Sequence, residues 1–125
     1  MDLTVKICGL STEATVDAAL DAGADMVGLV FFPRSPRFVP LARAASLAER
    51  ARGRAEIVVL IVDMDDRQIG EIVDRVKPDW LQLHGRETPE HTAAIARQFA
   101  TRTIKAVGVS AREHLAEAHR YEGYA

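Results

Sequence analysis

The sequence contains a single cysteine, and neither sign of charge dominates it. One cysteine cannot form a disulfide within the chain, so nothing here requires an oxidising compartment. The 16 basic residues nearly balance the 18 acidic ones, which gives a net charge of −2. Because no cluster of lysine and arginine offsets this near-neutrality, the sequence argues against a nucleic acid as a partner.

Long apolar runs are also missing. The longest one, Ile57 to Val62, has six residues, far fewer than the roughly 20 that a membrane-spanning helix requires. The start of the chain, Met1 to Thr4, has neither the basic residues nor the apolar stretch of a signal peptide. We therefore expect a cytoplasmic protein with no membrane partner.

Short segments rich in valine, isoleucine and leucine recur along the chain, which reads as a single domain over residues 1–125. Their starts lie 23, 30, 23 and 24 residues apart, which leaves room for a helix in each interval. Five βα units in series predict a parallel sheet with right-handed crossovers. The expected strands are Leu3 to Ile7, Met26 to Phe32, Glu56 to Val62, Asp79 to Leu83 and Thr103 to Val109.

Helix signals fill the intervals. A buried helical stripe is indicated by the spacing of Ile69, Ile72, Val73 and Val76. The first helix is expected from Thr12 to Ala22, and a second is expected to end at Gly53. The other expected helix starts are Pro40, Asp65, Thr88 with Pro89, and Ser110, which has Glu113 at capping-box spacing.

The length leaves two α/β folds open. At about 25 residues per repeat, a closed (β/α)₈ TIM barrel would need about 200 residues, whereas this chain holds five units. The chain is therefore either a complete five-stranded fold of the flavodoxin type or a TIM-type barrel truncated to about five parallel βα units. Length alone favours the flavodoxin type.

Polar residues interrupt three of the predicted strands. Lys6 and Cys8 share one face of the first strand, and Gln82 and His84 share one face of the fourth. Lys105 interrupts the fifth. The side that packs on helices must be apolar, so these residues are expected to face inward and to reach the carboxyl-end mouth, where barrel active sites lie.

Each of these residues also has a purely structural interpretation. A lone cysteine is most often a small buried apolar residue, and a histidine beside a glycine is common in turns. The two lysines could extend from fraying strand ends to water. Several polar residues on one inward face are harder to explain in this way, because buried polar groups need partners and a cleft supplies them.

The segment after the second strand, Phe31 to Phe38, is expected at the same rim. Two prolines stiffen it, and Arg34 and Arg37 give it a positive face suited to a carboxylate or phosphate. The alternative is an exposed loop with solvated arginines. The neighbouring aromatic residues Phe31, Phe32 and Phe38 favour an aromatic acid as the ligand.

Five motifs occur in order along essentially the whole chain. They are Lys6 to Leu10, Gly23 to Asp25 with Val27 to Phe31, Phe32 to Phe38, Leu81 to Gly85, and Ile104 to Val107. Each motif alone is weak, but the ordered set is specific. Together they resemble the phosphoribosylanthranilate isomerase family of tryptophan biosynthesis.

The resemblance implies a TIM-type barrel and an intramolecular aldose–ketose isomerisation without metal or organic cofactor. The reaction is the Amadori rearrangement of N-(5-phosphoribosyl)anthranilate to 1-(2-carboxyphenylamino)-1-deoxyribulose 5-phosphate, so the partner is a small phosphosugar carrying an anthranilate group. By resemblance Cys8 is the general base, Arg37 contacts the anthranilate end, and Lys6, Gln82 and His84 bind the substrate.

The chain departs from the family pattern at its end. The family's general acid is an aspartate at the end of strand six, and its phosphate site follows strands seven and eight; we find no general acid in these 125 residues. Asp63, Asp65 and Asp66 follow strand three and do not match that position. We therefore expect a truncated barrel that is inactive, or nearly so, by itself. Exposed sheet edges predict self-association.

Two other functions compete. A flavodoxin-like receiver domain would need an acidic pair after strand one, an aspartate after strand three and a lysine ending strand five. Asp63 and Lys105 match in part, but Cys8 and Gly9 replace the acidic pair that would bind Mg²⁺. The other alternative is a different sugar-phosphate barrel enzyme.

Overall fold

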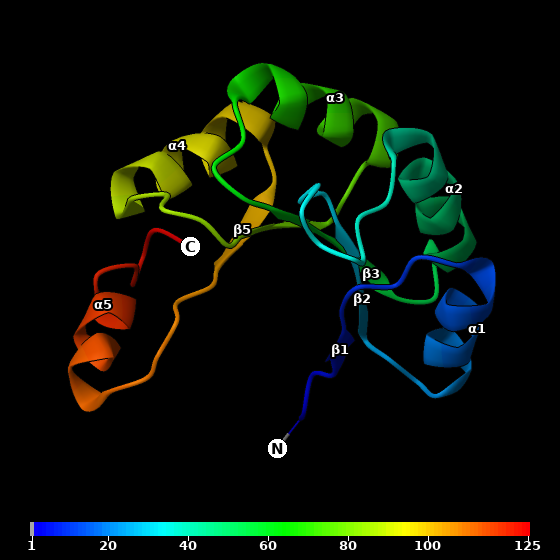
Figure 1. Cartoon of the computed structure of the whole chain (residues 1–125), viewed down its shortest axis with the longest axis horizontal. Coiled ribbons are helices and arrows are strands. Elements are labelled where there is room, and N and C mark those ends of the chain that lie inside the picture. Colours follow the sequence, from blue (N-terminus) through cyan, green and yellow to red (C-terminus); the bar gives the residue numbers. More distant parts are fainter. Residues whose placement is uncertain (1) are drawn as a thin grey trace.

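A computed structural model, which describes residues 2–125, contains five parallel strands, each followed by a helix (Figure 1). The strands are β1 (Lys6–Ile7), β2 (Met26–Val30), β3 (Glu56–Ile61), β4 (Trp80–Leu83) and β5 (Arg102–Lys105). The helices are α1 (Glu13–Asp21), α2 (Leu41–Ala51), α3 (Asp66–Val76), α4 (Pro89–Phe99) and α5 (Leu115–His119), with the short 3₁₀ helix η1 (Arg112–His114) before α5. All five expected strands are present, and each is shorter than expected.

The strands are hydrogen-bonded in chain order, β1-β2-β3-β4-β5, and every pair is parallel. A flavodoxin-type sheet instead reverses its strand order at a switch point and carries helices on both faces. Figure 1 shows α1 to α4 in an arc along one side of the strands, with no helix on the inner side. The flavodoxin-like alternative is therefore wrong for the part of the chain that the structure describes.

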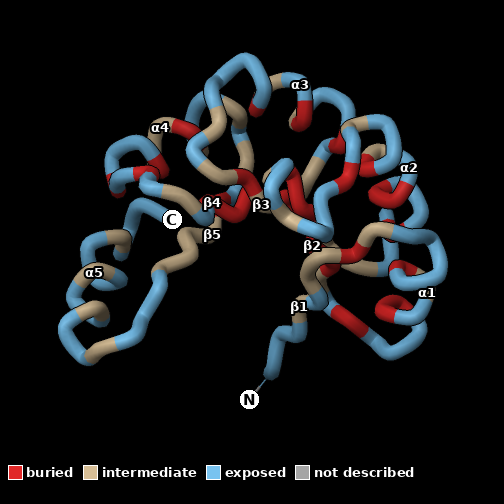
Figure 2. Tube along the Cα trace, viewed as in Figure 1, coloured by how far each residue is buried: buried red, intermediate tan, exposed pale blue. Residues whose placement is uncertain are grey.

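The core lies between the sheet and the arc of helices (Figure 2). It is built from alternate strand residues, because successive side chains of a strand point to opposite faces. Val59 and Leu81 are fully buried there, and Ile72 of α3 packs against the same cluster. Strand β3 is apolar throughout because both of its faces carry apolar side chains. Ile57, Val59 and Ile61 face the helices, and Val58 and Leu60 face the inner side of the sheet.

Helix starts follow local side-chain chemistry. The side chains of Thr12, Asp65 and Thr88 each accept a hydrogen bond from the backbone N–H three residues later, at 2.9 to 3.1 Å. The predicted capping box of Ser110 with Glu113 is wrong, because His114 Nδ1 accepts the backbone N–H of Ser110 instead, at 3.1 Å. None of the helices within residues 2–125 is long and apolar enough to cross a membrane.

Two aspartates fix the register of neighbouring strands. Asp25, just before β2, accepts the Val5 N–H at 2.8 Å and donates its own N–H to the Val5 carbonyl at 2.9 Å. Asp79, just before β4, makes the same pair of bonds with Ile57, at 2.7 and 2.8 Å. We call these two arrangements the aspartate clamps. Each clamp lies near the amino ends of a strand pair and fixes which residues are opposite each other. The relative positions of the carboxyl ends of the two strands are therefore fixed as well.

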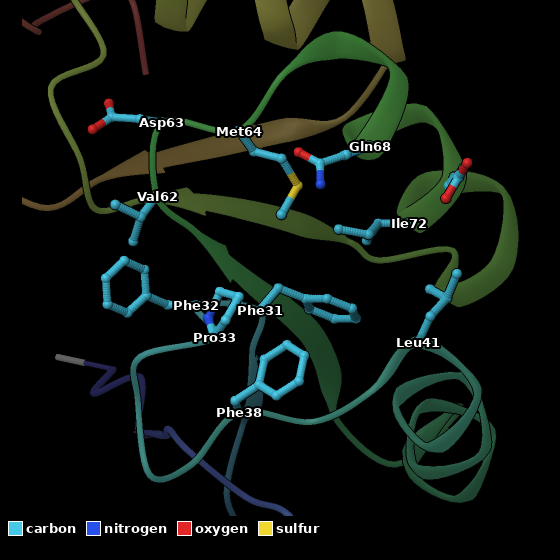
Figure 3. A pocket seen from close by; sticks show the side chains of 11 residues that line it. Phe31, Phe32, Pro33, Phe38, Leu41, Val62, Asp63, Met64, Gln68 and Ile72 are labelled. Atoms are coloured by element: carbon cyan, nitrogen blue, oxygen red, sulfur yellow. The ribbon is translucent and has the colours of Figure 1, made fainter.

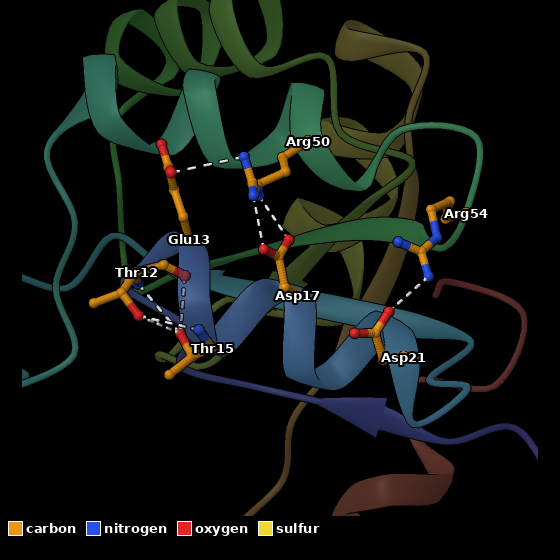
Figure 4. A network of polar contacts seen from close by, with 7 residues as sticks. All are labelled: Thr12, Glu13, Thr15, Asp17, Asp21, Arg50 and Arg54. Atoms are coloured by element: carbon orange, nitrogen blue, oxygen red, sulfur yellow. Dashed lines mark hydrogen bonds and ion pairs between the residues drawn. The ribbon is translucent and has the colours of Figure 1, made fainter.

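Exposed ion pairs join α1 to α2 and to the turn that follows α2 (Figure 4). Arg50 donates to both carboxylate oxygens of Asp17, at 2.6 and 2.7 Å, and Arg54 donates to Asp21 at 3.2 Å. The hydrogen bond from Arg50 holds the pKa of Asp17 below its ordinary value. These pairs are solvent-exposed, so they orient the two helices more than they stabilise the fold.

Candidate active site

A pocket of about 470 Å³ lies at the carboxyl ends of β1 to β4. Three of the predicted site residues line it: Cys8 after β1, Arg37 in the loop after β2, and His84 after β4. Its other lining residues are Gly9, Val30, Phe32, Ser35, Leu60 and Val62. The pocket therefore combines a thiol, an imidazole and a guanidinium with an apolar wall.

The Cys8 thiol lies against Gly28 of the neighbouring strand β2. A Cβ added to Gly28 of β2 would come within 2.9 Å of Cys8 Sγ, so the glycine leaves the space that the sulfur occupies. The N–H groups of Gly9 and Leu10 both donate to the Gly28 carbonyl, at 3.1 and 3.2 Å. These two bonds fix the turn that holds Cys8 at the pocket, where it is partly exposed.

Arg37 lies directly against this turn. Gly9 has a φ of +80°, which favours glycine, and a Cβ there would displace the Arg37 side chain from its present position. The Ser35 hydroxyl accepts the Arg37 N–H at 3.1 Å and shapes the loop. Within residues 2–125, no carboxylate forms an ion pair with the exposed Arg37 guanidinium, which leaves it able to bind an anionic ligand.

The three phenylalanines do not form one aromatic wall. Phe32 lines the Cys8 pocket, whereas Phe31 and Phe38 line an adjoining hollow of about 430 Å³ with Met64 and Ile72 (Figure 3). Phe32 lines both spaces and so lies between them. Phe31 lines only one of them, because neighbouring residues of an extended segment point to opposite sides. The prediction that the three rings act together rested only on their being close along the chain.

Lys6 and Gln82 lie on the same inner face but do not line the pocket. The Lys6 ammonium donates to the Gln82 side-chain oxygen, although β1 and β4 are not adjacent strands. Gln82 precedes His84 by two residues and shares its face, so this contact lies deeper, toward the amino ends of the strands. Lys6 and Gln82, both predicted to be site residues, therefore contact each other and do not line the Cys8 pocket.

The expectation that Lys105 faces inward is wrong. The register pairs Lys105 with Leu83, whose side chain lies in the helix-facing core, so Lys105 points to that side as well. Its ammonium is 2.7 Å from the Gly85 carbonyl and 3.1 Å from Glu87 Oε1, and the two side chains are only 5% and 2% exposed. Lys105 therefore belongs to a buried ion pair and not to the receiver-type contact with Asp63.

Sequence reasoning missed Glu87, which lies between the Leu81–Gly85 motif and the helix start at Thr88 and belongs to neither. Burial raises the pKa of Glu87, but hydrogen bonds from the backbone of Asp63 and of Glu87 itself, together with Lys105, outweigh burial and lower it. The available signal was Lys105, because a lysine in an apolar strand needs a buried acceptor. Within residues 2–125, no three histidine, cysteine, aspartate or glutamate side chains converge as a metal site requires.

Comparisons with known proteins agree with one another. A family model described as N-(5'phosphoribosyl)anthranilate (PRA) isomerase matches residues 5–123. The N-(5'-phosphoribosyl)anthranilate isomerase of Afipia carboxidovorans is 60% identical over 121 residues, which are 97% of this chain and 52% of that protein. The isomerase of Rhodopseudomonas palustris strain BisA53 is 58% identical over 125 residues, 100% of this chain and 57% of that protein. The chain thus spans about half the length of the curated relatives it matches.

Solved structures give the same result for the fold. A phosphoribosyl anthranilate isomerase in complex with reduced 1-(o-carboxyphenylamino)-1-deoxyribulose 5-phosphate superposes with a TM-score of 0.91 at 30% identity, covering 98% of this chain and 62% of that one. Monomers generated from the dimeric enzyme of Thermotoga maritima give a TM-score of 0.90 with the same identity and coverage. The five parallel strands and their helices therefore match part of these α/β structures.

Proposed function

Because the chain belongs to the N-(5'-phosphoribosyl)anthranilate isomerase family, we propose that it forms the base-bearing half of an enzyme that isomerises phosphoribosylanthranilate in tryptophan biosynthesis. The observation that carries the proposal is the meeting of Cys8, Arg37 and His84 at one pocket. This pocket lies at the carboxyl ends of parallel strands, where the active sites of βα barrels are built. The family match favours this reaction over that of another sugar-phosphate barrel enzyme.

In the proposed reaction, Cys8 acts on the ring-opened Schiff base of the substrate. Its thiolate removes the proton from C2, and the electron pair of that C–H bond forms the C1=C2 double bond of an enolamine. The displaced π electrons move to the iminium nitrogen. The enolamine then tautomerises to the ketone when C1 gains a proton and the C2 hydroxyl loses one. The partly exposed thiol beside Gly28 supports this role, because a base must reach its substrate.

Arg37 is proposed to hold the anthranilate carboxylate. A guanidinium presents a planar pair of donors that matches a carboxylate, and that of Arg37 forms no ion pair within residues 2–125. Phe32, Leu60 and Val62 offer an apolar wall for the ring beside it. His84 is proposed to contact the sugar, with Lys6 and Gln82 supporting the floor beneath.

We further propose that the single domain of residues 1–125 represents five of the eight units of a TIM-type barrel. The sheet has free edges at β1 and β5, and the relatives are nearly twice as long as this chain. Leu3, Val5 and Ile7 are 83%, 41% and 40% exposed. Further βα units would cover these apolar side chains and supply the strand-six general acid and the phosphate site. By themselves the 125 residues are proposed to turn over little or no substrate.

A chimera tests this function directly. Residues 1–125 are fused to the remaining carboxyl-terminal segment of the Afipia carboxidovorans relative, and consumption of N-(5-phosphoribosyl)anthranilate is followed. The chimera is expected to turn over substrate, and Cys8→Ala to lower kcat by about 10²–10⁴-fold, as for loss of a general base. Asp17→Asn, on the surface of α1, is the matched control and leaves kcat unchanged. An active chimera whose Cys8→Ala variant keeps more than a tenth of the rate contradicts the assignment.

A further inference from the structure

Glu87 and Lys105 form a buried ion pair that is not part of the Cys8 pocket. Their facing atoms are 3.1 Å apart. Removing two charges from water is costly, and apolar residues of similar size often stabilise a fold as well or better. The pair therefore needs an explanation beyond stability, and its hydrogen-bond partners supply one.

The Glu87 carboxylate joins two loops. Oε2 accepts the Asp63 N–H at 2.9 Å, in the segment after β3, and Oε1 accepts the Gly85 N–H at 2.9 Å, in the turn after β4. Lys105 adds a third element, because its ammonium donates to the Gly85 carbonyl at 2.7 Å. The Tyr121 ring lies 5.6 Å from the same ammonium. Both backbone polar groups of Gly85 are thus held by one ion pair.

The two loops also contact each other closely. The Asp63 carboxylate accepts the Arg86 N–H at 2.6 Å, and a Cβ added to Gly85 would lie 2.5 Å from Asp63 Oδ1. Asp63 itself has a φ of +45°, which is unusual for a residue with a side chain. This combination leaves the two turns little freedom to separate or slide while the ion pair is intact.

Each turn carries a residue of the Cys8 pocket. Val62 immediately precedes Asp63, and His84 immediately precedes Gly85. We propose that Glu87 and Lys105 are positioning residues, which hold Val62 and His84 at the separation that the Cys8 pocket requires. The proposal rests on the proposed function in one respect only, namely that His84 binds substrate. The placement of the two turns is independent of any reaction.

Hydrogen exchange measured by NMR on the 125-residue chain tests the placement. We expect Glu87→Gln to accelerate exchange at the amides of Asp63, Gly85 and His84 at least tenfold more than at Val59 in the core of β3. Lys105→Met, which keeps the stem but removes the charge, should do the same. Asp17→Asn breaks an exposed ion pair with Arg50 and is the matched control, with no selective change at these amides.

If Glu87 and Lys105 served only to stabilise the fold, the variants would show a different pattern of amide exchange. Uniform acceleration of all core amides overturns the proposal, as do unchanged rates at Gly85 and His84. Unfolding of both variants overturns it as well, because the pair would then be needed for the whole fold. In the active chimera, Glu87→Gln is expected to raise KM at least threefold while kcat changes less than twofold. Selective exchange with an inactive chimera would instead count against the proposed function alone.

Discussion

Lys6 on β1 donates a hydrogen bond to Gln82 on β4, across the inner face of a sheet in which β2 and β3 separate the two strands. Such a contact requires strong curvature, because two strands with two others between them would be too far apart in a flat sheet. The partner of the Lys6 ammonium is a neutral oxygen, and Gln82 is almost completely buried. This hydrogen bond therefore links the edge strand β1 to β4, three strands away across the curved sheet.

We expect Lys6→Met to lower the free energy of unfolding by about 1–3 kcal/mol, because the buried Gln82 oxygen loses its donor. Urea denaturation followed by circular dichroism measures the change. Arg67→Met is the control, because Arg67 is 88% exposed and forms its ion pair with Glu71 on the same helix. Equal stability of Lys6→Met and the parent chain would show that the contact does not constrain the sheet.

The buried Glu87 carboxylate predicts a pH dependence of stability. Its pKa in the folded chain lies below the ordinary value of 4.5. The folded state therefore binds this proton more weakly than the unfolded state, and the stabilisation is complete above about pH 4.5 and lost as pH falls through the folded pKa. Urea denaturation at a series of pH values should show a steeper acid loss in the parent chain than in Glu87→Gln.

Asp17 also has a lowered pKa, so its contribution must be separated from that of Glu87. The Asp17–Arg50 pair is exposed, and high salt screens exposed pairs more strongly than buried ones. The difference between the parent chain and Glu87→Gln should therefore persist in 1 M NaCl, a concentration at which the Debye length is about 3 Å. If the difference in stability between the parent chain and Glu87→Gln disappears in 1 M NaCl, the acid sensitivity comes from exposed ion pairs and not from the buried Glu87 carboxylate.

The only tryptophan provides a probe of the inner face. The guanidinium carbon of Arg102 lies 4.2 Å from the centre of the Trp80 ring, and Glu56 accepts hydrogen bonds from both side chains. Arg102→Met is expected to shift Trp80 emission to the red, increase acrylamide quenching and cost about 0.5–1 kcal/mol. Arg97→Met on α4 should leave the emission unchanged. Unaltered quenching in Arg102→Met would exclude this stacking in solution.

The apolar surface of β1 predicts self-association of the 125-residue chain. Leu3, Val5 and Ile7 are exposed beside a strand edge whose backbone groups are unpaired. Sedimentation velocity should show a concentration-dependent increase in mass, and Val5→Lys should reduce it. Leu115→Lys is the matched control, since Leu115 is 50% exposed but lies on α5, away from the edge. A monomer at all concentrations would contradict this prediction.

Features set by local sequence could be predicted. Asp65 and Thr88 cap helices because their side chains reach a backbone N–H three residues away, which needs no knowledge of the rest of the fold. The alternation within β3 and β4 likewise follows from strand geometry. Cys8, Arg37 and His84 were found because each ends a strand or lies in the loop after one.

Features that depend on register and distant partners could not be predicted. Lys105 was assigned to the wrong face because a single residue of register decides which side a strand residue takes. Glu87 was missed because its partners come from three separate segments. The Ser110 N–H donates to His114 Nδ1 and not to the Glu113 carboxylate, so the expected capping box does not form. The errors at Lys105 and Glu87 thus reflect tertiary contacts that override a local pattern, whereas the error at Ser110 is a choice between two nearby acceptors.

The aspartate clamps hold four of the five strands together as two pairs. One clamp belongs to β1 with β2 and the other to β3 with β4, whereas the β2–β3 boundary is joined by backbone bonds such as that from Glu56 N–H to the Asp25 carbonyl. A crossover placed in the segment between these pairs would transfer each carboxylate together with the amide it binds. Recombination between related barrels is therefore expected to be tolerated there better than within either pair.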